Sequence, residues 1–270
     1  MDITRVNLYD MLLCITNAID LAAPQLANHH QQVAFLSYHL AREMGLPEQE
    51  QQDIIIAAML HDIGAFTVAE RLALIEEEPV TVNSHAFRGA KLLESFEPLN
   101  KIARAVRYHH VQWQYAKGMH FNGQDVPLAS NLLYLADRTC VLIDKNKDVL
   151  PQIPDIMSEI KARKDSHFKP EAVNALVDNL SKIEYIWLSL VSKAPLEHLP
   201  AEILKMMDLN LDDLVNIAKM FSRIIDYRSH FTATHSAGVA KTAEKLGELA
   251  GFSVYECKML LIAGYLHDLG

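Results

Sequence analysis

The chain has 270 residues and half of them are hydrophobic, enough apolar material for one large domain or two modest ones with a buried core. A formal net charge of −9 and an isoelectric point of about 5.8 exclude the basic stripe that tracks a nucleic-acid backbone, so extended DNA or RNA is not expected as a partner. Three widely spaced cysteines without a C-x-x-C, no basic leader and no apolar run approaching about 18 residues exclude a disulfide framework, a signal peptide and a membrane span. A cytoplasmic protein without a membrane partner is predicted.

Glycine and proline are few and short alternating strands are scarce, which predicts an all-α fold. Apolar residues recur at helical spacing over residues 5–22, before Pro24, and over 26–44, where Gly45 closes the helix. A third helix opens near Pro47 and carries the block 54–60, which is apolar on all sides and should therefore be central. Further helices are predicted, in chain order, over 84–93 with Ser84 as N-cap, 99–110, 126–137, 170–180 and 182–191.

The third helix ends on His61-Asp62-Ile63-Gly64, which sets an imidazole beside a carboxylate. Adjacent helical residues point about 100° apart, so the pair suits a site where Asp62 reaches across two metals while His61 holds one. Such a pair alone is weak evidence. It gains weight because five further nitrogen and oxygen ligands fall at predicted helix ends or on apolar helical faces: His29, His85, His109, His110 and Asp137.

These seven ligands include no thiolate, which favours borderline to hard first-row metals. Two divalent ions are predicted, with Fe or Mn favoured and Zn or Ni as alternatives. Two ions about 3.5–4 Å apart can clamp the attacking and leaving oxygens of an in-line displacement at a phosphodiester. Asp62 and His61 are therefore the candidate catalytic residues of a two-metal phosphohydrolase.

The beginning of the chain recurs 206 residues later. The matching segments are Ile19-Asp20 with Ile225-Asp226, His29-x-x-x-Val33-Ala34 with His235-x-x-x-Val239-Ala240, and Leu60-His61-Asp62 with Leu266-His267-Asp268. Two amphipathic helices would match in leucine and alanine by chance, but not in two histidines and an aspartate at one fixed interval. We therefore predict a first domain over residues 1–195 and the start of a second copy over 196–270, with a partial site at His235, His267 and Asp268.

The order His, His-Asp, His, His-His, Asp resembles the HD superfamily of metal-dependent phosphohydrolases, and specifically its HD-GYP branch. The resemblance covers residues 20–190 and is carried by His29-x-x-x-Val33-Ala34, Ala58 to Gly64, His85-x-x-x-Gly89-Ala90, Tyr108-His109-His110 and Val126-Pro127 leading to Asp137. It implies an HD-domain helical bundle and a cyclic dinucleotide substrate that is opened by hydrolysis. It also implies one metal at His29, His61, Asp62 and Asp137 and a second at His85, His109 and His110, with Asp62 as the bridge.

Two departures from the family pattern concern the substrate. Ala65 stands where the family has a lysine that contacts phosphate, and the segment 111–118 stands where it has a Gly-Tyr-Pro loop. Residues near the motifs are the candidate substitutes: Arg88, Lys117 and Arg138 for a phosphate, and Trp113 for stacking on a base. Packing of its loop onto the domain is an equal alternative for Trp113. His30 is expected to face solvent, because Val33 and Leu36 put His29 on the buried side.

Two other functions stay open. The first domain would be a metal-bearing but catalytically weak or inactive sensor or regulatory module for a second HD-GYP domain, or it would hydrolyse another nucleotide or alarmone with the simpler His, His-Asp, Asp set. The expected small molecule is a nucleotide in the enzymatic alternatives. A second copy of the chain and a signalling protein are the macromolecular partners considered.

Overall fold

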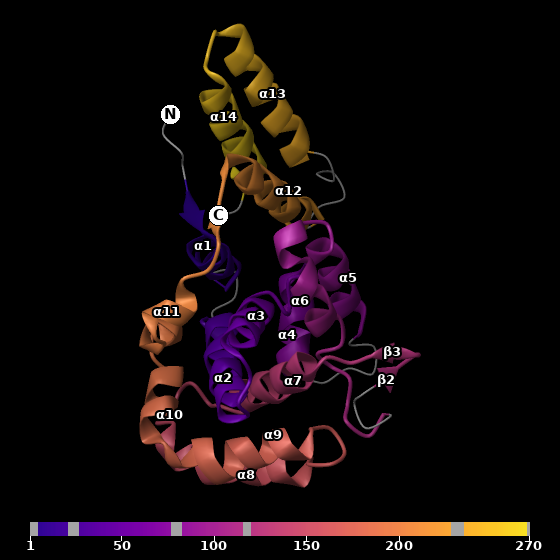
Figure 1. Ribbon diagram of the computed structural model, residues 1–270, viewed down its shortest axis with the longest axis vertical. Helices are drawn as coiled ribbons and strands as arrows, with labels where there is room; N and C mark the ends of the chain where they lie inside the picture. The colour runs from indigo at the N-terminus through magenta and orange to yellow at the C-terminus, as the bar shows by residue number, and fades with distance from the viewer. Residues whose placement is uncertain (1–4, 21–26, 77–82, 116–119, 228–234, 269–270) are drawn as a thin grey trace.

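The computed structural model describes residues 5–20, 27–76, 83–115, 120–227 and 235–268. Helices dominate these ranges, joined by two short antiparallel ribbons, so the all-α prediction is confirmed (Figure 1). The α-helices are α1 (Leu8–Asp20), α2 (His29–Glu43), α3 (Glu48–Met59), α4 (Val68–Glu76), α5 (Asn83–Leu93), α6 (Glu97–Arg107), α7 (Leu128–Val141), α8 (Ile153–Ala162), α9 (Pro170–Asn174), α10 (Glu184–Leu190), α11 (Ala201–Leu204), α12 (Leu211–Tyr227), α13 (His235–Leu249) and α14 (Val254–Leu266). Shorter helical turns are η3 (Leu150–Gln152), η4 (Ala175–Asn179), η5 (Leu180–Lys182) and η6 (Pro195–His198).

Most predicted helices are present, with small shifts at their ends. Ser84 lies inside α5, which begins at Asn83, so the predicted N-cap is wrong. The helix predicted over 99–110 ends at Arg107, which leaves His109 and His110 in the turn that follows. The ribbon of β2 (His120–Phe121) and β3 (Gln124–Asp125) was not predicted, because two-residue strands carry no readable alternation. Pro24 lies outside the described residues.

The centre of the molecule is the pair α2 and α3, with α6 and α7 packed alongside (Figure 1). The run from Ile54 to Leu60 on α3 is buried on every side, as its uniformly apolar sequence predicts. One continuous apolar core joins α3 to α1, α6, α7, α10 and α12. No helix within the described ranges is both long and apolar enough to cross a membrane.

Helices α12, α13 and α14 repeat α1, α2 and α3. Helix α13 begins and ends 206 residues after α2, and all three lie at the end of the molecule opposite α8 and α9 (Figure 1). Phe221 of α12 packs in the main core, whereas Ala218 belongs to a small separate cluster with α13 and α14. The domain boundary at residue 195 stays a prediction, and the main core continues past it through Leu196 and Leu199. Strand β4 (Asp208–Leu209) also pairs with β1 (Val6–Asn7).

Candidate metal centre

Helix ends bring the seven predicted ligands together. His29 opens α2, His61 and Asp62 follow α3, His85 lies in the first turn of α5, and the two remaining histidines follow α6. Asp137 lies further inside its helix, α7. All seven side chains are buried, although the surrounding helices come from segments more than 100 residues apart in the chain. Their ligand atoms form two neighbouring groups.

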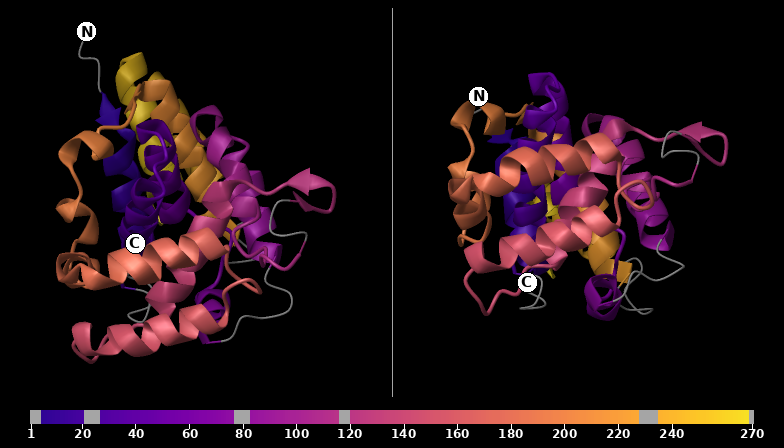
Figure 2. Two further views of the ribbon diagram at one scale, coloured as in Figure 1. Left: turned by 60° about the horizontal axis from the view of Figure 1, so that its bottom comes forward. Right: turned by 90° about the horizontal axis from the view of Figure 1, so that it is seen from below.

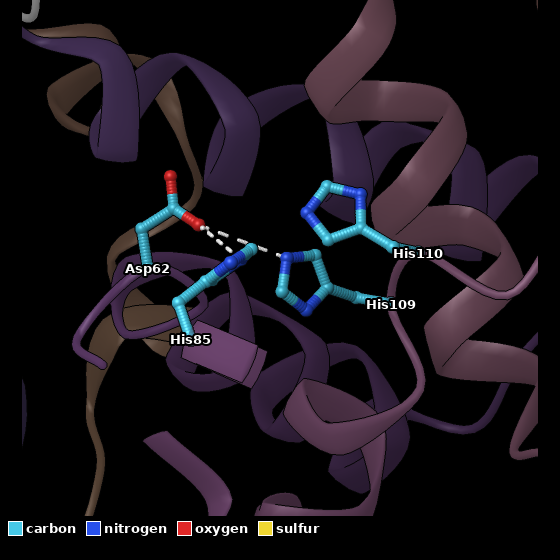
Figure 3. A group of neighbouring side chains, drawn as sticks. All are labelled: Asp62, His85, His109 and His110. Carbon is cyan, nitrogen blue, oxygen red and sulfur yellow. Dashed lines mark ion pairs between the residues drawn. The ribbon is translucent and has the colours of Figure 1, made fainter. Parts of the chain in front are cut away.

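The first group contains Asp62, His85, His109 and His110, whose ligand atoms all lie within 4.8 Å of one another. Figure 3 shows the Asp62 carboxylate facing the imidazoles that come from α5 and from the end of α6. Asp62 Oδ1 lies 3.2 Å from His85 Nε2 and 3.7 Å from His109 Nε2. The sequence order alone did not indicate which imidazoles share this oxygen.

The second group contains His29, His61 and Asp137. Asp137 Oδ1 lies 3.2 Å from His29 Nε2 and 3.9 Å from His61 Nε2. The other carboxylate oxygen of Asp62, Oδ2, lies 3.3 Å from His61 Nε2. The two oxygens of Asp62 therefore face the two groups, one each.

The hydrogen bonds of the imidazoles show why a cation fits between these atoms. His61 Nδ1 lies 2.7 Å from the Ala58 carbonyl oxygen, and His109 Nδ1 lies 2.6 Å from that of Val106. A carbonyl only accepts, so each Nδ1 carries a proton, and each Nε2 presents a lone pair when the ring is neutral. That lone pair faces carboxylate oxygens, which also only accept.

Within the described ranges, several of these buried atoms have no hydrogen-bond partner: His61 Nε2, Asp62 Oδ1, His85 Nε2, His109 Nε2 and both nitrogens of His110. A single buried polar atom without a partner costs about 1–3 kcal/mol, and here several converge on one place. The described residues thus fit divalent metal ions, which bind imidazole nitrogen and carboxylate oxygen together.

The electrostatics agree with that fit. Burial lowers the pKa of His29, His109 and His110, which keeps these imidazoles neutral and able to bind a metal. Burial also acts to lower the pKa of His61, but the charge of Asp62 and then that of Asp137 outweigh it and raise the pKa to about 9. The site thus stabilises positive charge at His61 Nε2, where either a proton or a metal ion would satisfy it.

Two arginines that are candidates for phosphate binding donate hydrogen bonds to protein oxygens. Arg138 donates from Nε and Nη2 to Asp137 Oδ2, at 3.0 and 2.9 Å, and so leaves Oδ1 of that carboxylate for the histidines. Burial opposes ionisation of Asp137, yet the charge of Arg138, together with His29 and His61, outweighs it and holds the pKa of that carboxyl well below its usual range. Arg88 donates to the Gly64 carbonyl oxygen and to Glu70, so a phosphate would compete with these contacts.

The other predicted substrate contacts are placed as follows. The Trp113 ring is half-buried, and the ammonium nitrogen of Lys169 lies 4.4 Å from its centroid. The backbone N–H of Trp113 donates to the His167 carbonyl oxygen. Both contacts are of the kind that the loop-packing alternative for Trp113 expects. Ala65 is fully buried against Leu74. Lys117 lies outside the described residues.

The prediction that His30 faces solvent is wrong. His30 is 3% exposed and its Nδ1 lies 2.5 Å from Asp20 Oδ1. In the repeat, the equivalent Asp226 Oδ1 accepts from the backbone N–H and the hydroxyl of Ser236. Both copies therefore use the aspartate at the end of one helix to hold the first turn of the next, and the repeated Ile-Asp dipeptide was the signal that pointed to it.

Gly64 and Gly89 form a close backbone crossing that the sequence analysis missed. A Cβ on Gly64 would lie 2.1 Å from the His85 carbonyl oxygen and 2.4 Å from the Gly89 nitrogen. Only glycine allows this approach, which places α5, and with it His85, against the turn that carries Asp62. The two glycines of the motifs His-Asp-x-Gly and His-x-x-x-Gly were the available signal.

The residues predicted as a partial second site also lie together. His235 Nε2 is 3.2 Å from His267 Nε2 and 3.6 Å from Asp268 Oδ2. His267 Nδ1 lies 2.9 Å from the Gly264 carbonyl oxygen, which repeats the contact of His61 with Ala58. All three side chains are exposed, unlike the seven of the first copy.

The fold and the site define a helical protein with buried His/Asp clusters suited to divalent metal ions. Residues 26–142 match the family model described as HD domain, a range that includes all seven clustered residues. This part of the chain is therefore similar to HD domains, and the fold is an HD-domain helical bundle.

Comparison with known proteins finds similar chains in bacteria. A 3′3′-cGAMP-specific phosphodiesterase 1 of Vibrio cholerae is 29% identical over 98% of this chain and 64% of its own length. A cyclic di-GMP phosphodiesterase of Thermotoga maritima is 26% identical over 55% of this chain and 43% of its own length. The crystal structure of a cyclic GMP-AMP specific phosphodiesterase of V. cholerae aligns over 99% of this chain and 71% of that chain, with 21% identity and a TM-score of 0.75, which shows a shared fold. The chain thus spans less than two thirds of both curated relatives.

Proposed function

We propose that this protein is a metal-dependent HD phosphodiesterase that hydrolyses a phosphodiester bond of a cyclic dinucleotide, with 3′3′-cGAMP as the first candidate. The observation that carries the proposal is the orientation of Asp62, whose two carboxylate oxygens face two separate groups of imidazoles. A carboxylate in that position can bridge two ions, and a pair of ions is suited to in-line displacement at phosphorus.

We assign His29, His61, Asp62 and Asp137 to one ion and His85, His109 and His110, with Asp62, to the other. The nitrogen and oxygen donors without thiolate favour Fe or Mn, with Zn or Ni as alternatives. When bound, two such ions supply Lewis acidity toward the phosphoryl oxygens. The chain itself fixes the donors: backbone carbonyls orient His61 and His109, and Arg138 orients Asp137.

The substrate class rests on the relatives. Cyclic dinucleotides are the substrates in the names of the V. cholerae and T. maritima proteins, and the first of these is similar along almost the whole of this chain. A linear nucleotide or alarmone is the competing substrate, because the segment 111–118 lacks a Gly-Tyr-Pro loop. Parallel assays with 3′3′-cGAMP, cyclic di-GMP and linear dinucleotides separate these possibilities.

The test combines metal analysis with hydrolysis of 3′3′-cGAMP by protein purified without a chelator. We expect about two first-row metal equivalents per chain, and in the Asp62→Asn variant a loss of activity of about 100-fold or more, since even an outer-shell change costs about 10–100-fold. The exposed carboxylate of Asp178 in η4 provides the matched control Asp178→Asn. A protein without metal, or an Asp62→Asn variant with undiminished turnover, would refute the proposal.

A second candidate function is favoured by Ala65. This residue is fully buried, so it presents no side chain to a phosphate at a position where the family has a lysine. We infer that residues 196–270 begin a second HD repeat, and in this alternative the first domain holds metal and regulates a second catalytic one. It predicts turnover that survives His61→Ala but not His267→Ala in a protein that includes both repeats; the opposite dependence contradicts it.

A further inference from the structure

A separate concave site lies on the outer side of α5 and α6, beside the β2–β3 ribbon. Its volume is about 390 Å³, and the residues that line it are Phe87, Arg107, Tyr108, Phe121, Asn122 and Gln124. In Figures 1 and 2 the ribbon projects from the helical body next to these two helices. None of the lining residues belongs to the metal groups described above.

Arg107 is the centre of this site. Its guanidinium carbon lies 4.6 Å from the centroid of the Phe87 ring and 5.6 Å from that of Tyr108, so aromatic rings hold the planar group in place. Arg88, Arg104 and Arg138 each donate to a carbonyl or carboxylate oxygen. Among the described residues, Arg107 has no such oxygen partner, so its N–H donors remain available to a ligand.

The ribbon adds two amide side chains on a fixed support. Positive φ angles at Asn122 and Gly123, 49° and 76°, indicate the tight hairpin turn that matches the twist of the strands. Arg104 Nη2 donates to the Asp125 carbonyl oxygen at 2.7 Å and so ties the ribbon to α6. In the part of the chain that the structure describes, no intramolecular hydrogen bond engages the side-chain amides of Asn122 or Gln124.

This combination favours a nucleobase over a free phosphate. Aromatic rings, of which Phe87 is 45% exposed, provide stacking surface, and the amides both donate and accept hydrogen bonds. Phosphate sites are typically built from helix N-termini and several backbone N–H groups, whereas this pocket lies at the C-terminal end of α6. A guanidinium fork matches the O6 and N7 acceptors of guanine, while adenine would place its N6 donor against the same N–H groups.

The pocket is next to the metal centre along the chain. Tyr108 directly precedes His109, and their Cα atoms are therefore about 3.8 Å apart. Phe87 follows His85 by two residues in the first turns of α5. We propose that this pocket binds the guanine base of the nucleotide substrate and gives the enzyme its preference for guanine. That this guanine is part of the substrate rests on the proposed function, whereas the binding of guanine in the pocket does not depend on it.

The test uses nucleosides, which lack the phosphate that the metal centre would attract, and the protein as purified with its metals. Calorimetric titration should show guanosine binding about tenfold or more tightly than adenosine, with 7-deazaguanosine weakened because it lacks N7. Arg107→Lys keeps the charge but loses the fork, so it should abolish the preference for guanosine. Phe87→Ala, at an exposed position, should weaken all three nucleosides, and Arg223→Gln on the exposed face of α12 is the control.

The outcomes separate this proposal from the proposed function. A preference for guanosine that is lost in Arg107→Lys, in a protein that hydrolyses no cyclic dinucleotide, supports the guanine pocket and refutes the proposed phosphodiesterase activity. Hydrolysis of 3′3′-cGAMP with equal affinity for guanosine and adenosine, or with binding unchanged in both pocket variants, refutes the pocket. In an active enzyme, Arg107→Lys should raise KM for 3′3′-cGAMP more than it lowers kcat.

Discussion

Replacing Gly64 with alanine should disturb one metal group and leave the other in place. The new Cβ would lie 2.1 Å from the His85 carbonyl oxygen, where an ordinary carbon–oxygen contact is about 3.3 Å or more, so the two segments must separate by about 1.2 Å. The second close atom is the backbone nitrogen of Gly89, so no flexible side chain can move aside to absorb the change. The movement would displace the start of α5 and with it His85.

The expected cost is that of overpacking, about 1–3 kcal/mol in the free energy of unfolding, or a fall in Tm of about 5 °C. We expect metal content to drop from about two equivalents to about one, because the displaced residue is His85, which belongs only to the group with His109 and His110. Scanning calorimetry and elemental analysis measure the two effects. Gly238→Ala on α13 is the control, since no atom of the described residues lies within 4 Å of its added Cβ. If Gly64→Ala keeps both metals and its Tm, the crossing of these backbones does not position His85.

Three other changes test the surroundings of the site. Arg138→Gln leaves the buried Asp137 carboxylate without its cation and should lower the free energy of unfolding, measured in urea, by about 3 kcal/mol. His30→Ser should be more stable than His30→Ala by about 1 kcal/mol, because serine can hydrogen-bond Asp20 as Ser236 does Asp226 in the repeat. Because the pKa of His61 is raised to about 9, a metal ion that binds this imidazole below that pH must displace its proton. The metal affinity of the group formed by His29, His61 and Asp137 should therefore rise ~tenfold per pH unit between about pH 6 and 8.

Each of these has a clear contrary result. Unchanged urea stability of Arg138→Gln, relative to Arg223→Gln, would show that Asp137 does not need the guanidinium. Equal free energies of unfolding for the serine and alanine variants would show that a hydrogen bond from residue 30 to Asp20 does not stabilise the fold. In a competition titration, the group with His109 and His110 should bind metal with little change over the same pH range, because burial lowers the pKa of both. If the metal affinities of both groups changed with pH in the same way, the assignment of the displaced proton to His61 would be contradicted.

The sequence by itself determined the helical class, the central position of α3 and the repeat of the first three helices, because these follow from local patterns. An apolar block without a polar face must be buried, and a fixed interval between histidines survives only in a true repeat. The sequence also identified the seven clustered residues as candidate ligands, since imidazoles and carboxylates on apolar faces need a partner.

Only the tertiary structure decided how those side chains divide. The grouping of the imidazoles around the two oxygens of Asp62 depends on how α2, α3, α5, α6 and α7 cross, and no local pattern encodes that crossing. For the same reason the sequence did not indicate that Arg138 contacts Asp137; its proximity to the motifs suggested a phosphate contact, which stays a prediction. His30 is buried against Asp20, although helical periodicity suggested that it faces solvent. A long side chain contacts whichever partner the packing brings within a few ångströms, so its role depends on the tertiary structure and not on a local sequence pattern.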